Sequence, residues 1–341
     1  MPTGMNAGNV RLKGCLFLAA ALAVGAQQRP AGQAPAPGAA PPRPDNAQSL
    51  AHLEAARKLA GTDMTAPFNF FCVPANLRAN SATAPELAPV KLFDNLFAAG
   101  NSETVVYAIT TSDGIILIDG GYGDRVETVL VSGLQALGLD PAKVRYVLVT
   151  HGHGDHFGGS AYFQERYSAR VGMSAADWDL VRPANPPAQT SPNAVRPPRR
   201  DLLLEEGKPI TLGDVSVTPV LIPGHTPGSM AFIFPVRDGK TVHVAGLFGG
   251  AMLTLERVMT PGLRQYVGTI DHYADIARRM NVDVEIQNHP IFDDMSSRLA
   301  RLKARRTGEA HPFVIGGGAY GRFWNVVSEC IQAEIARRGD G

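Results

Sequence analysis

The stretch His151-Gly-His-Gly-Asp-His156 places four metal-binding side chains within six residues. Three imidazoles and one carboxylate, separated only by glycines, are ligand types that zinc prefers. The glycines permit backbone angles that other residues resist, and they keep the loop slim. The alternative is a solvated, histidine-rich turn without a metal, but a turn so rich in ligands has little structural use. The stretch therefore predicts a metal site.

The stretch follows a segment that is typical of a buried strand. Residues 144–149 (Val-Arg-Tyr-Val-Leu-Val) are mostly apolar, and residues 157–163 after the stretch are suited to open a helix. The ligands are therefore expected at the carboxyl end of a sheet strand, where open α/β sheets usually place their sites. Because alternate residues of an extended turn point the same way, His151 and His153 can reach one metal. Asp155 and His156 then face a second position beside it.

Two further histidines follow strand-like segments. His225 lies in a loop after residues 215–221, and His289 lies just past residues 282–288. Taken alone, each would more often be a capping or loop residue. Together with the first stretch they place ligands on three strand-end loops, which favours a shared metal site.

These motifs together resemble the metallo-β-lactamase superfamily. The resemblance rests on residues 151–156, on Gly-His-Thr-Pro-Gly-Ser at 224–229, on the strand-end His289 and on Ile-Asp-Gly-Gly at 118–121. It runs from about Phe70 to the C-terminus. It implies an αββα sandwich, of the α+β or α/β class, in which two mixed sheets are flanked by helices. It also implies a site for one or two zinc ions along the sheet edge.

The expected elements fit that order. Strands are expected over 105–110 and 115–118, and helices over 125–137, 266–280, 296–305 and 323–338. In the helix over 266–280, His272 falls outside the apolar stripe, so it is left out of the site. His243 lies on an expected buried strand and is interpreted as a core residue.

The strand between the loops of His225 and His289 indicates which branch of the superfamily this chain resembles. Glyoxalase II, ribonuclease Z and acyl-homoserine-lactone lactonases typically carry a bridging Asp there, and the commonest β-lactamases of the superfamily carry a Cys. This chain has Gly246 at that place and no Cys on the strand. The pattern is similar to the third subclass of metallo-β-lactamases. By that resemblance the two zinc ligand sets are His151, His153 and His225 for one ion, and Asp155, His156 and His289 for the other.

The resemblance implies a zinc metallohydrolase that opens the cyclic amide of a β-lactam, an activity linked to antibiotic resistance. Two Zn²⁺ ions held close lower the pKa of a shared water, so a zinc-bound hydroxide attacks the carbonyl carbon. Asp155 is the expected catalytic residue, because it would orient that hydroxide as well as bind metal. Asp119 is expected behind the ligands, orienting the metal loop, although a turn residue before two glycines is an equally good interpretation. Neither Gly-x-Ser-x-Gly nor Ser-x-x-Lys occurs, so no serine nucleophile is indicated.

One departure from the third subclass leaves the substrate open. That subclass usually presents Asp-Ser-x-Ser where this chain has Gly246-Leu-Phe-Gly249, and those serines help to hold the β-lactam carboxylate. Leu247 and Gly249 cannot donate such hydrogen bonds, so Arg257 or Arg264 is the candidate source of positive charge. Residues that bind the substrate are otherwise unknown. The alternative is a hydrolase of the same fold that acts on another ester, lactone, thioester or amide. A non-catalytic zinc-binding protein is the distant alternative.

The N-terminal part is typical of an exported protein. Residues 1–26 have basic residues, a short apolar run and small residues at the end, which predicts a cleaved signal peptide. Residues 27–66 are interpreted as a linker rich in Pro and Ala with an N-terminal extension, and residues 67–341 as the hydrolase domain. We therefore expect a periplasmic or secreted enzyme without a stable membrane anchor. The mature chain would keep Cys72 and Cys330, which are able to form one disulfide or to stay free.

Charge and loop composition add little about partners. The net charge of +1 gives no electrostatic case for nucleic acid, so the expected partner is a small-molecule substrate. The oligomeric state is not indicated by the sequence. Residues 182–198 form a long Pro-rich loop at a position that borders the substrate cleft in related lactamases. Trp178 beside it is interpreted as an apolar wall or, more simply, as a core residue.

Overall fold

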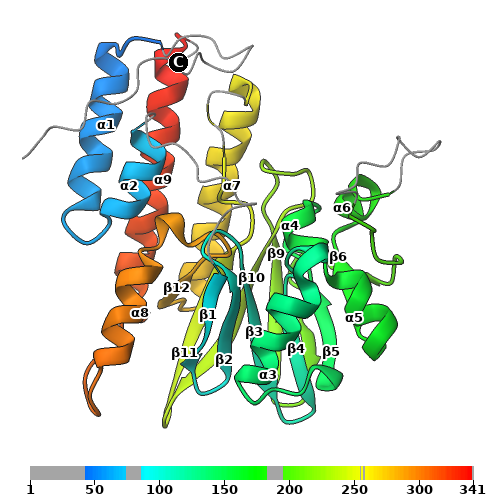
Figure 1. Cartoon of the computed structure of the whole chain (residues 1–341). Helices are drawn as coiled ribbons and strands as arrows, with labels where there is room; N and C mark the ends of the chain where they lie inside the picture. The colour runs from blue at the N-terminus through cyan, green and yellow to red at the C-terminus, as the bar shows by residue number, and fades with distance from the viewer. Residues whose placement is uncertain (1–42, 74–85, 183–194, 254, 256–257, 340–341) are drawn as a thin grey trace, which may run out of the picture. The chain divides into compact units, whose positions relative to one another are not determined.

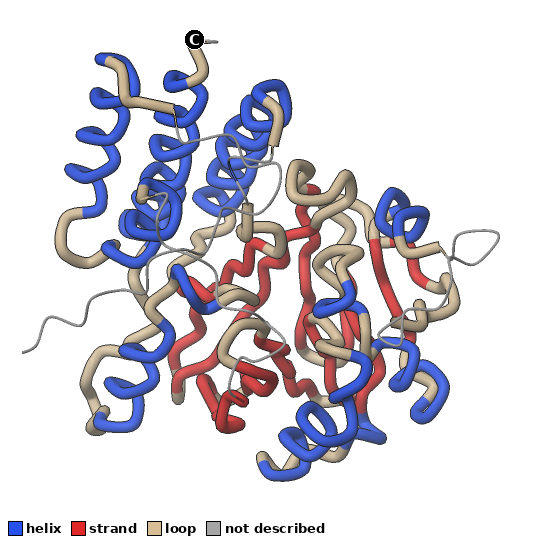
Figure 2. Tube along the Cα trace, turned by 45° about the horizontal axis from the view of Figure 1, so that its top comes forward, coloured by secondary structure: helices blue, strands red, loops and turns tan. Residues whose placement is uncertain are grey.

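Two β-sheets face each other across a shared core. The computed structural model describes residues 43–73, 86–182, 195–253, 255 and 258–339. These residues belong to one compact unit, Pro41–Gly341. The expected signal peptide, residues 27–42 of the linker and Arg257 lie outside the described residues. Within the unit, helices flank the strands on both outer sides (Figures 1 and 2).

The larger sheet has seven strands that follow chain order. The first four pair antiparallel, and parallel pairing begins between the fourth and the fifth. The strands are β1 (Glu86–Phe93), β2 (Leu96–Asn101), β3 (Val105–Thr111), β4 (Gly114–Ile118), β5 (Val144–Leu148), β6 (Arg170–Met173) and β7 (Leu202–Leu203).

The smaller sheet has five strands in the order β12-β11-β10-β9-β8. The strand β12 runs parallel to its neighbour β11, whereas the other pairs are antiparallel. The strands are β8 (Ile210–Leu212), β9 (Val215–Leu221), β10 (Met230–Asp238), β11 (Thr241–Phe248) and β12 (Val284–Ile286). Both sheets are thus mixed, as the sequence predicted.

Alternation along the strands divides the apolar side chains among three cores. In β3, for example, Tyr107 faces the core between the sheets, whereas Val106 and Ala108 face the outer helices. The helices on that side are α3 (Ser132–Ala136), α4 (Gly154–Phe157), α5 (Ser160–Tyr167) and α6 (Ala175–Leu180). The outer face of the smaller sheet packs on α1 (Ala47–Ala60), α2 (Thr65–Cys72), α7 (Thr260–Arg279) and α9 (Gly317–Arg337). These four layers confirm the expected αββα sandwich, and α8 (Met295–Ala304) packs at the end of the inter-sheet core.

The segment expected as a helix over 125–137 is helical but irregular. It begins as a 3₁₀ turn (Gly123–Arg125), continues as a π-helix (Val126–Val131) and ends as α3. Val126, Val129 and Val131 are β-branched, which weakens the preference for a regular α-helix. Gly138 follows with a φ of 74°, a left-handed angle that suits the end of a helix.

The ordered unit begins earlier than residue 67, where the sequence predicted the hydrolase domain to start. Helix α1 lies wholly before that boundary, and its Ala56 and Ala60 are buried in the core shared with α9. A disulfide between Cys72 and Cys330 joins α2 to α9, with the two Cα atoms 4.7 Å apart. The chain before the first strand is therefore attached to the last helix by packing and by a covalent bond.

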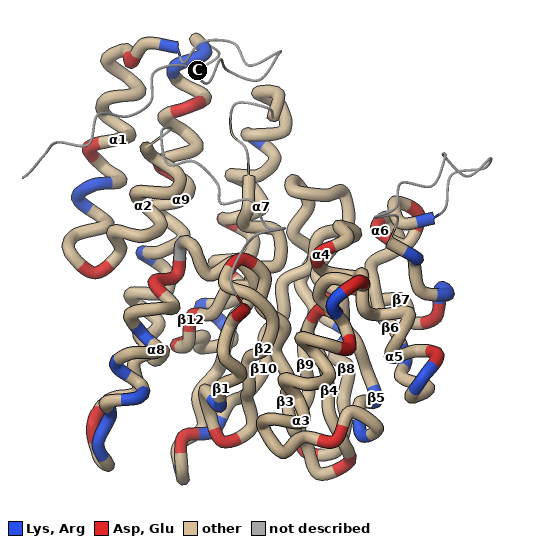
Figure 3. The backbone as a smooth tube through the Cα atoms, in the orientation of Figure 1, with Lys and Arg blue, Asp and Glu red and all other residues tan. Residues whose placement is uncertain are grey.

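The surface of the described unit carries both signs of charge. Acidic and basic residues are interspersed along the backbone (Figure 3). Among the described helices, none combines the length and the apolar character needed to cross a bilayer.

Candidate metal centre

The six predicted ligands meet at one edge of the sandwich. His151 and His153 lie in the loop after β5, and Asp155 and His156 lie in the short helix α4 that follows it. His225 lies between β9 and β10, and His289 follows β12. Backbone hydrogen bonds hold these loops together, because Met230 N donates to Thr150 O at 2.8 Å and Val105 N donates to Asn288 O at 2.8 Å. Residues as far apart in sequence as His156 and His289 thereby come within 3.1 Å of each other at their Nε2 atoms.

The first group consists of His151, His153 and His225, whose candidate ligand atoms all lie within 4.8 Å of one another. His225 Nε2 lies 3.0 Å from His151 Nε2 and 3.0 Å from His153 Nδ1. His151 is buried, His225 is partly buried and His153 is exposed. The group is therefore open to solvent on one side. We refer to these three residues as the outer triad.

The second group consists of Asp155, His156 and His289, again with ligand atoms within 4.8 Å. His156 Nε2 lies 3.1 Å from His289 Nε2 and 3.2 Å from Asp155 Oδ2. Both histidines are buried, and the Asp155 side chain is 23 % exposed. We refer to these residues as the inner triad.

In three of the histidine rings, the nitrogen that faces away from the centre (the far nitrogen, Nδ1) makes a hydrogen bond that fixes the orientation of the ring. His156 Nδ1 lies 2.8 Å from Asp119 Oδ2, and His289 Nδ1 lies 2.7 Å from the carbonyl oxygen of Glu103. These oxygens only accept, so both Nδ1 atoms donate. The hydroxyl of Thr150 donates to Asp119 and can accept from His151 Nδ1 at 3.1 Å. In the neutral form of each ring, the unprotonated nitrogen is therefore Nε2, which faces the centre.

This arrangement fits a metal better than it fits a hydrogen-bonded cluster. When both rings are neutral, the Nε2 atoms of His156 and His289 are both acceptors, and two lone pairs that face each other at 3.1 Å repel unless a cation lies between them. In tetrahedral zinc sites two nitrogen ligands lie about 3.3 Å apart, which follows from Zn–N bonds of about 2.0–2.1 Å. The observed separations of 3.0–3.1 Å are close to that value. Each triad therefore has the donor set and the spacing of a zinc site.

The charges in the inner triad favour a bound cation. Burial opposes charge on His156, but the carboxylates of Asp155 and Asp119 outweigh it and raise the pKa of His156 to about 10. Burial also opposes charge on Asp155, yet His156 and then His289 lower the pKa of Asp155 well below its usual range. Two carboxylates thus stabilise positive charge at the position where the ring nitrogens meet.

In the outer triad burial dominates. It lowers the pKa of His225 to about 3, with His153 and His156 adding repulsion, and it lowers the pKa of His151 well below its usual range. These rings are therefore neutral near pH 7, which is the protonation state in which imidazole binds a metal.

Asp119 is buried behind the inner triad and has a backbone φ of 67°. Its carboxylate accepts hydrogen bonds from Thr150 N at 2.7 Å and from the Thr150 hydroxyl at 2.9 Å, besides the bond from His156. Asn288 Nδ2 adds a further contact to Asp119 Oδ2 at 3.2 Å. Asp119 therefore joins the His156 ring to the backbone of the loop that carries His151, and its role in orienting a metal ligand stays a prediction.

Asp177 is a contributor that the sequence analysis missed. Its Oδ2 accepts from Gly152 N at 2.7 Å and from the Thr226 hydroxyl at 2.8 Å, and its Oδ1 accepts from Gly228 N at 2.9 Å. One carboxylate thus links the loop of His151 and His153 to the loop of His225. The sequence signal at this place, Ser174-x-x-Asp177, indicates a helix cap, and the Ser174 hydroxyl does accept from Asp177 N. Only the fold reveals the second role.

Strand β11 offers no polar side chain to the centre at the positions that the sequence analysis singled out. A Cβ on Gly246 would lie 2.3 Å from the Tyr320 hydroxyl, so this position faces α7 and α9. Leu247 is buried between the sheets. A Cβ on Gly249 would lie 2.3 Å from Thr150 Cβ, so no larger residue fits there. Arg264 is exposed on α7, and no contact joins it to the metal ligands among the described residues.

Other residues from the sequence analysis lie outside the centre. His243 is only partly buried and pairs with Asp283 at 2.6 Å, so it is not the packed core residue that was expected. His272 is exposed and contacts Glu206. Trp178 is buried in the core and donates to the Leu202 carbonyl. Residues 183–194 of the Pro-rich loop lie outside the described residues.

Comparison with known proteins agrees with this geometry. Residues 99–239 match the family described as the metallo-beta-lactamase superfamily. The domain belongs to the metallo-β-lactamase superfamily. The matched range contains five of the six predicted ligands, and His289 follows it in the sequence.

Relatives of the superfamily domain include hydrolases of several kinds. A hydroxyacylglutathione hydrolase of Acidiphilium cryptum is 31% identical over 103 residues, which are 30% of this chain and 36% of that protein. The acyl-coenzyme A thioesterase MBLAC2 of Gallus gallus is 32% identical over 158 residues, 40% of this chain and 55% of that protein. The chain thus spans between about a third and a half of the length of these two relatives.

The similarity to solved structures is more extensive. BJP-1, a subclass B3 metallo-β-lactamase of Bradyrhizobium japonicum, has 26% sequence identity and a TM-score of 0.61. The match covers 76% of this chain and 94% of BJP-1. The superfamily domain therefore shares its architecture with a subclass B3 enzyme, while the two relatives above are named as a hydroxyacylglutathione hydrolase and an acyl-coenzyme A thioesterase.

Proposed function

We propose that this protein is a zinc-dependent hydrolase that holds two zinc ions, one on each triad. The observation that carries the proposal is the convergence of six ligand atoms in two groups, each within 4.8 Å, with the far nitrogens of three rings fixed by hydrogen bonds. Such outer hydrogen bonds orient histidine ligands in metal sites. A non-catalytic zinc-binding protein would have no need of two triads, one of which is open to solvent on one side.

The residues of the chain supply binding and orientation in this proposal. Bound zinc ions would supply Lewis acidity, which activates a water and polarises the carbonyl group of a substrate. Asp155 contributes a carboxylate that is 23 % exposed and is held by the Thr104 hydroxyl at 3.2 Å. A carboxylate in this position can orient the attacking water and hold its proton, which is the catalytic role that we assign to Asp155. Asp119 and Asp177 position the ligand loops.

β-Lactam opening is the first candidate reaction. The observation in its favour is the fold similarity to BJP-1 over 94% of that protein, together with two triads that lack a Cys ligand. This reaction breaks the amide C–N bond of the lactam ring.

Hydrolysis of another ester, lactone or thioester is the second candidate, and strand β11 favours it. Leu247 is buried and Gly249 has no room for a side chain, so these positions offer no hydroxyl to a substrate carboxylate. The names of the curated relatives, a hydroxyacylglutathione hydrolase and an acyl-coenzyme A thioesterase, also refer to thioester hydrolysis.

The experiment is a hydrolysis assay on the purified zinc-loaded protein. Penicillins, cephalosporins and carbapenems form one panel, and simple esters, lactones and thioesters form the other. We expect turnover on at least one panel, at a kcat/KM of about 10⁴ M⁻¹s⁻¹ or more, that a zinc chelator abolishes and added zinc restores. Turnover that persists after complete removal of the metal would contradict the proposal.

We also propose that the protein is exported, as the sequence of residues 1–26 suggests. The Cys72–Cys330 disulfide supports this, because structural disulfides persist in oxidising compartments. A fractionation experiment on the native host, with an antibody to the folded domain, tests it. Protein found only in the cytoplasm at its full length would contradict export.

A further inference from the structure

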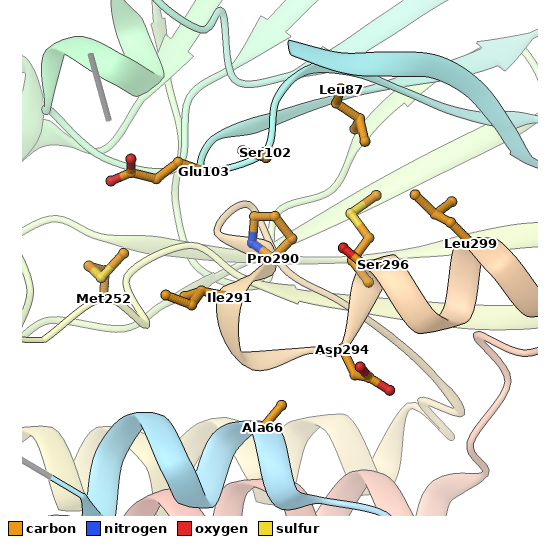
Figure 4. A pocket seen from close by; sticks show the side chains of 11 residues that line it. Ala66, Leu87, Ser102, Glu103, Met252, Pro290, Ile291, Asp294, Ser296 and Leu299 are labelled. Carbon is orange, nitrogen blue, oxygen red and sulfur yellow. The ribbon is translucent and has the colours of Figure 1, made fainter. Parts of the chain in front are cut away.

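A pocket of about 280 Å³ is lined in part by Pro290 and Ile291, the residues that follow His289 of the inner triad (Figure 4). Its volume is near the lower end for small-molecule sites, which suits a small group rather than a drug-sized molecule. Most of its lining is apolar and is contributed by β1, the segment after β11, the segment after His289 and α8. The apolar side chains are Leu87, Met252, Pro290, Ile291, Met295 and Leu299. Ala66 of α2 closes one side.

The pocket adjoins the metal ligands through two short segments. Pro290 and Ile291 directly follow His289 in the chain and line the pocket. Glu103 also lines it, and its carbonyl oxygen accepts the hydrogen bond from His289 Nδ1 at 2.7 Å. These two contacts are the observations that relate the pocket to the inner triad.

The charged groups of the pocket are of one sign. Glu103 and Asp294 line it, and no Lys or Arg does so among the described residues. Glu103 Oε2 is buried and finds no hydrogen-bond partner within the described part of the chain. A buried carboxylate oxygen without a partner is costly, so the site gains free energy when a donor or a cation reaches it and loses free energy when an anion does.

We propose that this pocket binds the acyl portion of the substrate and selects an apolar, uncharged or cationic acyl group over an anionic one. The proposal rests on the proposed hydrolase function and narrows its substrate class. The substrate is then an ester, thioester or lactone of an apolar acid. The carboxylate of a β-lactam would have to lie outside this pocket.

The first test is a series of p-nitrophenyl esters assayed with the zinc-loaded full chain. Butanoate, hexanoate and octanoate esters vary the chain length, and octanoyl analogues with a terminal carboxylate or a terminal trimethylammonium vary the charge. We expect kcat/KM to rise by up to about fourfold for each methylene until the pocket is filled, since a buried methylene is worth ~0.8 kcal/mol. We expect the carboxylate analogue to react at least about tenfold more slowly than the neutral ester, because its charge meets Glu103 in a poorly solvated site.

Two variants connect those preferences to the pocket. Glu103→Gln keeps the backbone carbonyl that holds His289 and removes the negative charge of the side chain. The kcat/KM of the neutral ester divided by that of the anionic ester should therefore fall to about threefold or less. Glu54→Gln, an exposed change on α1, is the matched control and should leave the ratio as it is. Ala66→Trp fills the pocket and should remove the dependence on chain length. Thermal unfolding and zinc content show whether each variant is folded and loaded.

The outcomes separate this proposal from the proposed function. A zinc-loaded protein that hydrolyses none of these esters, thioesters or β-lactams contradicts the proposed function. Hydrolysis without chain-length dependence, or with an unchanged charge ratio in Glu103→Gln, overturns the pocket proposal alone. Calorimetry with octanamide gives a readout without turnover: binding to the wild type and loss of binding in Ala66→Trp is expected. Equal binding to both proteins, or to neither, would overturn the proposal.

Discussion

The inner and outer triads are built from the same ligand types but are held in different ways. In the inner triad both rings are buried, and Asp119 and the Glu103 carbonyl hold the far nitrogens of those rings. In the outer triad His153 is exposed, and the loops of His153 and His225 are joined through the Asp177 carboxylate, which bonds loop groups rather than the imidazole rings. Both rings of the inner triad are thus held individually, whereas in the outer triad the Thr150 hydroxyl holds the His151 ring and the Asp177 carboxylate holds the loops.

The difference indicates that the two triads have different roles in the centre. Because each ring of the inner triad is held by its own hydrogen bond, we expect the inner triad to keep its geometry whether or not a metal ion is bound. Rings that are fixed through their loops leave one side of the site open, which a substrate needs in order to approach. The comparison can be tested by removing one ligand or one anchor at a time.

The largest effect should follow the loss of a ligand from either triad. We expect His153→Ala and His289→Ala each to lower kcat/KM by about 10³-fold or more, because Lewis-acid stabilisation of the transition state is worth several kcal/mol. Zinc content, measured by mass spectrometry of the native protein, should fall toward one ion per chain in both variants. His272→Ala, an exposed histidine on α7, is the control and should change neither quantity.

A variant that loses zinc but keeps its activity would remove that triad from the mechanism. If only His289→Ala were inactive, for example, the outer triad would serve structure rather than catalysis.

Asp119→Asn should weaken the inner triad next most strongly. The amide has one oxygen for the donors from Thr150 and His156, and its NH₂ group would face one of them. We expect zinc affinity of the inner site to fall by about 10–100-fold, which is typical for loss of a carboxylate behind a histidine ligand. Competition with a chromogenic chelator measures it. Asp124→Asn, an exposed change nearby in the chain, should have no effect.

Asp177→Asn should act on the outer triad instead. Two backbone N–H groups and the Thr226 hydroxyl lose part of their acceptor, so zinc affinity of the outer site should fall by up to about tenfold while the inner site is unchanged. Asp179→Asn lies on the same helix and pairs only with surface arginines, so it is the matched control. Equal losses at both sites would show that the two triads are one coupled unit, contrary to the comparison above.

The smallest effect concerns the loop that carries His289. Burial, and then the nearby Glu285, raise the pKa of Asp293 well above its usual range, while Arg298 opposes the shift. Because the folded state holds this proton more tightly than the unfolded state, its contribution to stability is present at low pH and is lost as the pH rises above the usual aspartate range. Asp293→Asn cannot titrate. We expect its melting temperature, relative to wild type, to rise by about 2 °C between pH 5 and pH 8. A relative melting temperature that stays constant would contradict this assignment.

The ligands and the fold could be predicted from the sequence because their signals are local. His151 to His156 lie in one short stretch after a strand, and His225 and His289 follow strands that alternation makes recognisable. Asp119 also has a local motif. The agreement of strands β3, β4, β5 and β9 with their expected ranges has the same origin.

The anchors of the outer triad could not be predicted, because they depend on contacts between distant segments. Asp177 meets Gly152 and Thr226 across 25 and 49 residues, and its local pattern signals a helix cap. Helix α1 was missed for a different reason. Its buried face is made of small residues such as Ala56 and Ala60, which give little apolar contrast along the sequence.

The disulfide between α2 and α9 has a mechanical consequence. The bond closes a ring of chain that starts at Cys72 and ends at Cys330, and every strand of both sheets lies within it. A pulling force applied to the two ends of the protein would pass through the sulfur atoms and not through the sheets. Such a force would strip α1 and the last turns of α9, after which the extension would stop with the metal-binding loops still folded. Reduction of that single bond would open the whole sandwich to the same force.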